Sequence, residues 1–234
     1  MASAESAAEA AALADATLLR VLARMASPLR HDLAGALLVP QMQLQMLRRK
    51  LGRPGADPVH AIAAIDDVLL RLQDLRAVQL AAVSWLSGHD ERRLALEDAV
   101  AKAAADFALP FSARGSEVVC TMAATGKCYA AQPLLLLVHA AFCAVLDDEA
   151  SASARIEVEC SATDDGVAVQ WRATPATTDL VPESPESPES AGATPVHLVL
   201  SVAGVAALCA RWGARFSAEG TNWRLLPGAA NEAE

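Results

Sequence analysis

The chain has 234 residues, of which 53% are hydrophobic and only 4% aromatic, and its formal net charge is −9. This length allows one large domain or two small ones with a substantial core. Residues 1–90 carry nine basic and nine acidic side chains, so all of the net negative charge falls on residues 91–234. Such a surface lacks the phosphate-neutralising lysines and arginines that nucleic-acid binding requires, so we expect no nucleic-acid partner.

Cysteine usage and the N-terminal sequence indicate the compartment. The five cysteines include no C-x-x-C pair and are odd in number, which is typical of reduced thiols in a cytoplasmic protein. The start Met1-Ala-Ser-Ala-Glu-Ser lacks the basic region of a signal peptide, and no uncharged apolar run approaches the length of a membrane span. We therefore expect a cytoplasmic protein without a membrane segment.

The first 90 residues predict a helical hairpin. Apolar residues recur at helical spacing from Leu18 to Leu47, which predicts one helix over residues 3–50. The segment 53–56 predicts a turn, and Asp57-Pro58 predicts the start of a second helix that runs to about residue 85. Two helices cannot bury all of the apolar residues in this segment by themselves. A four-helix bundle formed with a second copy would bury them, so we expect a homodimer.

From about residue 92 the pattern changes to mixed helices and strands. Residues 174–195 contain Pro-Glu-Ser three times, which predicts a flexible acidic loop. The fold class is therefore α+β, with a hairpin domain over residues 1–90 and an α/β domain over residues 91–230. The expected helices cover 94–107, 133–146 and 196–211, and the expected strands cover 117–122, 155–160, 167–172, 215–218 and 222–226.

One histidine on the first helix is the leading candidate for chemistry. In a helix, Leu29 and Leu33 each lie about 200° around the axis from His31, so the apolar stripe faces away from it. Its helical neighbours above and below, including Ala34 and Gly35, are all small or short, which leaves room for a partner protein. Pro40 removes one backbone hydrogen bond and favours a bend in the helix after the histidine.

The residues around His31 suit phosphoryl transfer. A neutral imidazole is a good nucleophile near pH 7, and its phosphorylated nitrogen is a good leaving group. Asp32 can orient or stabilise the ring, and Arg30 or Arg24 can stabilise phosphoryl charge. The alternative is that His31 is simply a solvated residue on a charged helix face, and the residue types alone favour that alternative.

The layout resembles the core of a two-component histidine kinase. Leu29-Arg-His31-Asp32-Leu33 is similar to the phospho-acceptor H-box, and the order of elements after residue 91 is similar to a GHKL-type ATP-binding domain. The nucleotide motifs differ, however. The run 139–147 carries no asparagine, 171–175 replaces D-x-G-x-G, and 195–200 replaces G-x-G. Without the metal-holding asparagine and the phosphate-cradling glycines, we expect no ATP binding and no bound cofactor.

A kinase-like dimer without a nucleotide site resembles the ChpT-like histidine phosphotransferases. The resemblance implies that His31 relays a phosphoryl group between receiver-domain aspartates, with Mg expected only on the receiver. It implies response-regulator receivers and a hybrid histidine kinase as partners, and a phosphotransferase without autokinase activity. One departure is that the family commonly has a proline about five residues after the histidine, whereas this chain has Pro40. The alternatives are a diverged active kinase and a non-enzymatic dimeric adaptor in which His31 is a relic.

Overall fold

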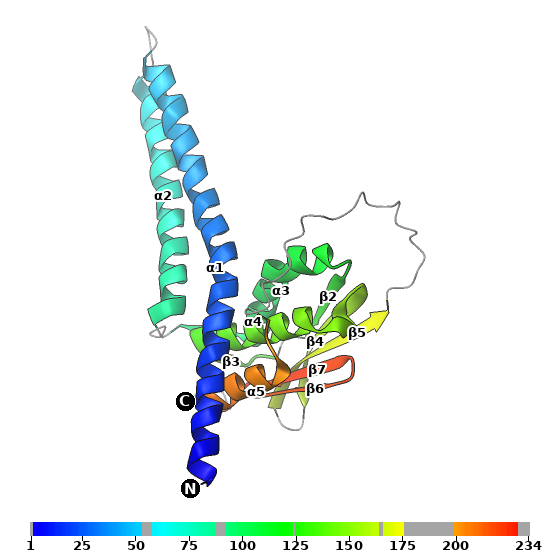
Figure 1. The fold of residues 1–234 in the computed structure, drawn as a ribbon. Helices are drawn as coiled ribbons and strands as arrows, with labels where there is room; N and C mark the ends of the chain where they lie inside the picture. The colour runs from blue at the N-terminus through cyan, green and yellow to red at the C-terminus, as the bar shows by residue number, and fades with distance from the viewer. Residues whose placement is uncertain are drawn as a thin grey trace. The chain divides into compact units, whose positions relative to one another are not determined.

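The computed structural model describes residues 2–52, 58–87, 92–123, 125–163, 166–175 and 199–228. The described chain is α+β, as the sequence predicts (Figure 1). The helices are α1 (Ala2–Leu51), α2 (Pro58–Ser87), α3 (Leu96–Ala113), α4 (Ala131–Asp147) and α5 (Val202–Arg211), with a short 3-10 helix η1 (Glu149–Ser151). The strands are β1 (Arg93–Ala95), β2 (Glu117–Met122), β3 (Cys128–Ala130), β4 (Ala154–Thr163), β5 (Gly166–Pro175), β6 (Arg215–Glu219) and β7 (Asn222–Leu226).

The described residues form two compact units. One unit contains Met25–His89, and the other combines Met1–Arg24 with Asp90–Glu234. The predicted domain boundary near residue 90 stays a prediction. No pattern in the sequence indicates that the first 24 residues of α1 group with the α/β part. Helix α1 therefore contributes to both units.

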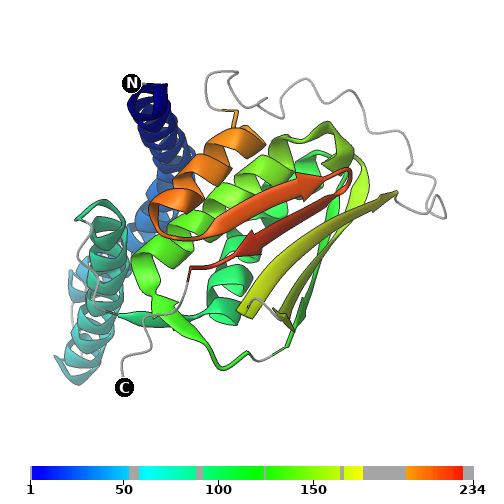
Figure 2. The same ribbon diagram turned by 90° about the horizontal axis from the view of Figure 1, so that it is seen from below.

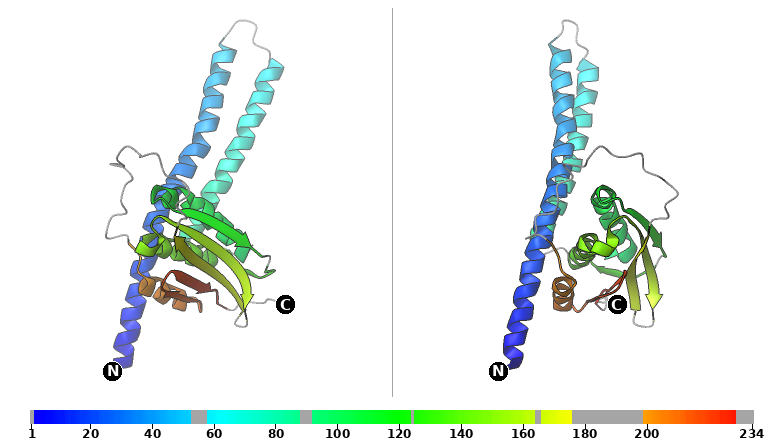
Figure 3. Two further views of the ribbon diagram at one scale, coloured as in Figure 1. Left: turned by 90° about the vertical axis from the view of Figure 1, so that its right-hand side faces the viewer. Right: turned by 45° about the vertical axis from the view of Figure 1, so that its right-hand side comes forward.

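The hairpin unit consists of the second half of α1 and the whole of α2, which lie side by side (Figure 3). Both helices follow the predicted segments closely. Arg48, Arg49 and Lys50 occupy the last turn of α1, where their charges oppose the negative end of the helix dipole. The predicted turn residues 53–56 and the predicted helix start at Asp57 lie outside the described part of the chain.

The α/β unit is built on a five-stranded sheet in the order β2-β4-β5-β7-β6, with α3, α4 and α5 on one face (Figure 2). Strand β2 runs parallel to β4, and the remaining neighbours are antiparallel. Side chains on β4 alternate between the two faces, so Ile156 and Val158 are buried while Glu157 and Glu159 are exposed. A separate two-stranded sheet, β1 with β3, was not predicted because each strand has only three residues.

Two predicted helix boundaries are wrong. Helix α3 continues past residue 107 and through Pro110, since Phe111 in its last turn is fully buried. Helix α5 begins only at Val202 instead of residue 196, because Ser201 is extended and its side chain caps the helix by accepting a hydrogen bond from the Gly204 amide. Residues 176–195 of the predicted acidic loop lie outside the described part of the chain, whereas Thr174 and Pro175 belong to β5.

Candidate functional site

The predicted site residues are consecutive on α1. The backbone of His31 and Asp32 is helical, whereas their side chains lie outside what the structure describes. Arg30 is described and its side chain is exposed. Leu29 and Leu33 are partly buried, which is consistent with an apolar stripe on a different face of α1. The proposed roles of these residues therefore stay predictions.

The described residues that follow His31 in α1 leave the helix surface open. Ala34 and Gly35 are both exposed. A Cβ atom built on Gly35 finds no described atom within 4 Å outside the helix backbone. Since both residues carry at most a methyl group, a partner protein can approach the α1 backbone closely there.

The guanidinium of Arg24, one of the two candidates for phosphoryl stabilisation, is engaged in an ion pair within the α/β unit. It donates to Oδ2 of Asp147 at the end of α4, at 2.5 Å, and both side chains are almost fully buried. The same Oδ2 accepts a hydrogen bond from the Leu200 amide at 2.8 Å. Sequence reasoning missed this contact because Arg24 and Asp147 are 123 positions apart and share no motif.

The hairpin leaves many large apolar side chains exposed. In the described part of the unit, Met25, Leu47 and Val68 are buried. Fourteen others of this kind are at least 39% exposed, which is far more than a single solvated hairpin normally shows. They are Leu37, Leu38, Val39, Met42, Leu44, Met46, Leu51, Val59, Ile62, Ile65, Leu69, Leu70, Leu72 and Leu80.

Helix α4, the counterpart of the nucleotide-contacting helix in the resemblance, is almost entirely buried. Its histidine, His139, is fully buried and both ring nitrogens face acceptors. Nδ1 lies 2.8 Å from the Leu135 carbonyl oxygen and Nε2 lies 2.9 Å from Oδ2 of Asp106. Burial acts to raise the pKa of Asp106, but the hydrogen bond from His139 and the charge of Lys102 outweigh it, so this pKa lies below its ordinary value. His139 is thus a bonded core residue, in keeping with its position on an apolar helix.

We expect Asp106→Asn to destabilise the protein at pH 7 by about 2 kcal/mol, because His139 would lose a charged partner inside the core. The lowered pKa means that the folded state binds fewer protons than the unfolded state around pH 3 to 4. The stabilisation is therefore present above pH 4 and is lost as the pH falls through the folded-state pKa. Urea unfolding should give free energies of unfolding for the wild type and the variant that converge as the pH falls. A difference in the free energy of unfolding that stays constant down to pH 2.5 would contradict this role for the Asp106 carboxylate.

Aromatic side chains fill the space between the sheet and α4. Trp171 on β5 and Trp223 on β7 are register partners, and both are essentially unexposed. Trp171 meets Phe142 of α4 edge to face, with ring centroids 5.4 Å apart. Phe142 in turn stacks on Phe107 at 5.7 Å. This interior is packed with rings.

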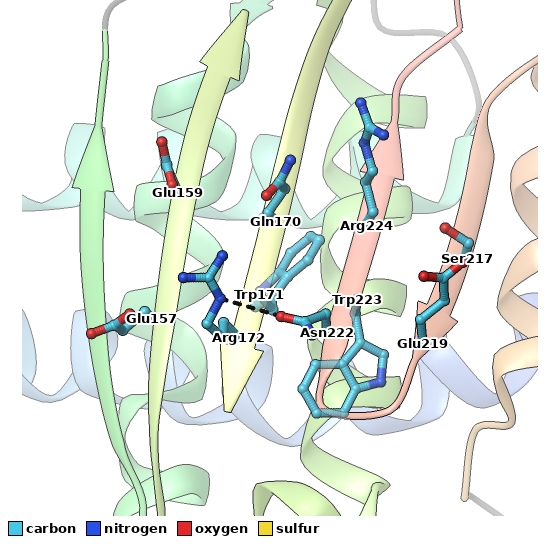
Figure 4. Close-up of a pocket in the computed structure, with 10 residues that line it drawn as sticks. All are labelled: Glu157, Glu159, Gln170, Trp171, Arg172, Ser217, Glu219, Asn222, Trp223 and Arg224. Carbon is cyan, nitrogen blue, oxygen red and sulfur yellow. Dashed lines mark hydrogen bonds between the residues drawn. The ribbon is translucent and has the colours of Figure 1, made fainter. Parts of the chain in front are cut away.

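A depression of about 370 Å³ lies on the opposite, helix-free face of the sheet (Figure 4). The walls carry both charges, and Arg172 donates to the side-chain oxygen of Asn222. The alternation of polar and apolar residues on β4, β5 and β7 is the sequence signal for this polar face. Its outward-facing lining residues are Glu157, Glu159, Gln170, Arg172, Ser217, Glu219, Asn222 and Arg224.

Neither a metal cluster nor a membrane helix is present in the described part of the chain. Among these residues, no three histidine, cysteine, aspartate or glutamate side chains gather as metal ligands would. No described helix combines the length and apolar content that a bilayer crossing requires.

Comparison with known proteins gives structural neighbours but no family. No family model matches this chain, and no curated protein matches it. Among solved structures, the Acinetobacter baumannii histidine kinase AdeS is similar at 14% identity and a TM-score of 0.36, covering 83% of this chain and 94% of the kinase chain. A histidine kinase from Burkholderia phymatum is similar at 14% identity and a TM-score of 0.34, covering 84% and 99%.

Proposed function

We propose that this chain is a histidine phosphotransferase that relays a phosphoryl group between receiver-domain aspartates through His31, without using ATP. The observation that carries the proposal is the occupied interior of the α/β unit. The polar groups of α4 bond within the protein, with His139 on Asp106 and Asp147 on Arg24, and Trp171 packs between the sheet and α4. Among the described residues, these polar groups of α4 are engaged within the protein, which supports a histidine helix that takes its phosphoryl group from another protein.

The relay needs only an accessible imidazole on this chain. A neutral ring nitrogen of His31 attacks the phosphorus of an aspartyl phosphate, and the N–P bond forms as the P–O bond to the aspartate breaks. The aspartate carboxylate leaves, and the ring retains the proton on its other nitrogen. Asp32 stabilises the resulting cationic ring, and Arg30, which is exposed and directly precedes His31, stabilises phosphoryl charge. The reverse step passes the group to a second receiver.

The receiver supplies the metal in this scheme. Carboxylates of the receiver hold the Mg ion that neutralises phosphoryl charge, so this chain needs no metal ligands of its own. The receivers would belong to response regulators, and the first phosphoryl donor to a hybrid histidine kinase. Both kinds of partner follow from the two-component resemblance.

Phosphoryl labelling from two donors tests the proposal. The purified chain is incubated either with receiver domains phosphorylated by radiolabelled acetyl phosphate or with γ-labelled ATP, and acetyl phosphate alone serves as the control. We expect acid-labile label on the chain only with the phosphorylated receiver. Self-labelling with ATP would instead identify a diverged kinase. Receiver binding without label from either donor would identify an adaptor.

We further propose that the hairpin forms a dimeric four-helix bundle, which would cover the exposed apolar residues. Ile65 and Leu72 are seven residues apart and so lie on one face of α2, and they are 43% and 39% exposed in the single chain. The double variant Ile65→Glu/Leu72→Glu should convert a dimer of 24.4-kDa chains into a monomer, as measured by light scattering. Leu109→Glu, at an exposed position of α3, should stay dimeric. A double variant that keeps the dimer mass would place the interface elsewhere.

A further inference from the structure

The helix-free face of the sheet carries its polar side chains in two rows that cross β4, β5, β7 and β6. In register order, one row is Glu159, Gln170, Arg224 and Ser217, and the other is Glu157, Arg172, Asn222 and Glu219. All eight residues line the depression of about 370 Å³ (Figure 4). This volume lies in the range of pockets that hold small organic molecules.

Two arginines in the middle of these rows lack an acidic partner. Arg172 on β5 stands opposite Asn222 on β7, and Arg224 lies two residues further along β7, so the arginines are diagonal neighbours. Nε of Arg172 donates to Oδ1 of Asn222 at 3.3 Å. Within the described ranges neither guanidinium forms an ion pair. Long side chains reach each other across such a diagonal, so the two positive charges repel unless an anion lies between them.

A third arginine on the same face shows the contrast. On β4, Nη1 of Arg155 lies 3.4 Å from Oε2 of Glu117, and its Nε lies 3.6 Å from Oε1 of Glu157. Glu157 is also the register partner of Arg172. Because Arg155 engages this carboxylate, Arg172 is left without the cross-strand ion pair that its register offers. An anion from outside the chain would supply the missing charge.

Arg224 is also more enclosed than a solvated surface arginine. Its side chain is half-buried, and its Nε is enclosed without a hydrogen-bond partner among the described residues. An enclosed donor that lacks an acceptor costs free energy, more so in a charged group. An anion at the terminal nitrogens of the guanidinium would offset that cost through charge-assisted hydrogen bonds.

Two carboxylates flank the arginine pair on opposite sides. Glu159 on β4 and Glu219 on β6 are both exposed, and neither is hydrogen-bonded or ion-paired to another described side chain. Each stands two strands away from the arginine of its own row, which is about 10 Å between Cα atoms. The side-chain amides of Gln170 and Asn222 lie between the charges, and an amide both donates and accepts as a peptide group does.

We propose that this depression binds a short zwitterionic peptide. The C-terminal carboxylate of the peptide lies between Arg172 and Arg224, and its ammonium group lies at Glu159 or Glu219. An extended chain spans roughly 3.5 Å per residue, so two or three residues cover the distance between the charges. The site belongs to the α/β unit and does not depend on the proposed phosphoryl transfer.

Three related tripeptides test the site, with amide chemical shifts of the isotope-labelled full chain as the readout. Trialanine carries both charges, trialanine amide lacks the carboxylate, and N-acetyl-trialanine lacks the ammonium group. We expect trialanine to bind and to shift amides of β5 and β7. The amide should bind at least tenfold more weakly, because its missing carboxylate meets two arginines, and the acetylated form at least threefold more weakly. Equal affinity of trialanine and either analogue overturns the proposal, and so does the absence of shifts at ~10 mM trialanine.

Variants with a matched control locate the contacts. Arg224→Gln should raise the Kd of trialanine at least tenfold, whereas Arg155→Gln, on the same face but outside the depression, should change it less than twofold. Glu159→Gln/Glu219→Gln should weaken trialanine at least threefold and leave N-acetyl-trialanine unchanged. Equal weakening by Arg224→Gln and Arg155→Gln would show general charge attraction and overturn the site. Urea unfolding checks that each variant is folded, and the exposed Arg172→Gln takes the place of Arg224→Gln if the latter is not.

Discussion

His31→Ala should abolish phosphoryl labelling of the chain by a phosphorylated receiver. The transferred group needs a nucleophilic nitrogen that is neutral near pH 7, and an alanine side chain offers no atom that can form the N–P bond. The expected loss is complete, down to the background of the assay, because no neighbouring residue replaces the ring. Asp32→Asn should slow transfer without abolishing it, since the amide can still orient the imidazole but cannot offset its charge.

The hairpin offers a matched control for the His31 variant. His60 lies on α2, is exposed, and belongs to the same compact unit. His60→Ala should therefore label like wild type. Label that persists in His31→Ala and disappears in His60→Ala would move the acceptor to α2. Label that persists in both would place it outside the hairpin.

Trp171→Ala should destabilise the protein by about 3–5 kcal/mol, a large part of the 5–15 kcal/mol that typically stabilises a domain. The side chain is unexposed, meets Phe142 edge to face and lies beside Trp223 on the next strand, so its removal leaves a cavity in the centre of the unit. The midpoint and slope of urea unfolding measure the effect.

Two further variants identify packing as the cause. The indole nitrogen of Trp171 has no hydrogen-bond partner in the described part of the chain, so Trp171→Phe breaks no polar contact and should cost much less than alanine. Trp212→Ala, which removes a half-buried indole at the end of α5, should cost about 1 kcal/mol. Equal losses in Trp171→Ala and Trp212→Ala would show that the interior does not depend on this ring.

The sequence predicted those elements whose signal is local. The stripe on α1 and the alternation on β4 and β5 depend on neighbours a few residues apart, and these elements formed as expected. The boundaries failed where local propensity competed with packing. Burial of Phe111 extends α3 through a proline, and the cap at Ser201 delays the start of α5.

The same distinction between local patterns and tertiary packing applies to the candidate site. His31 was predicted from helical spacing together with the histidine-kinase resemblance and stays a prediction, whereas the burial of His139 follows from its place on an apolar helix. The sequence pattern does not indicate the contact of Arg24 with Asp147. The positive charge of Arg24 suits a phosphoryl group as well as it suits a carboxylate. A pair separated by 123 positions is decided by tertiary packing, which periodicity does not report.

The discontinuous α/β unit also has a consequence for synthesis. Asp15 and Arg211, which form an ion pair, are 196 positions apart, so α1 is complete long before its docking partner α5 is made. A nascent chain can form the hairpin at once, whereas Ala14, Thr17 and Val21, which are buried in the complete unit, must wait for the final elements. An expressed fragment that begins near residue 91 would lack these residues and leave the surface around Gly204, which touches Thr17, uncovered. Both ends of the chain are therefore needed to complete one unit.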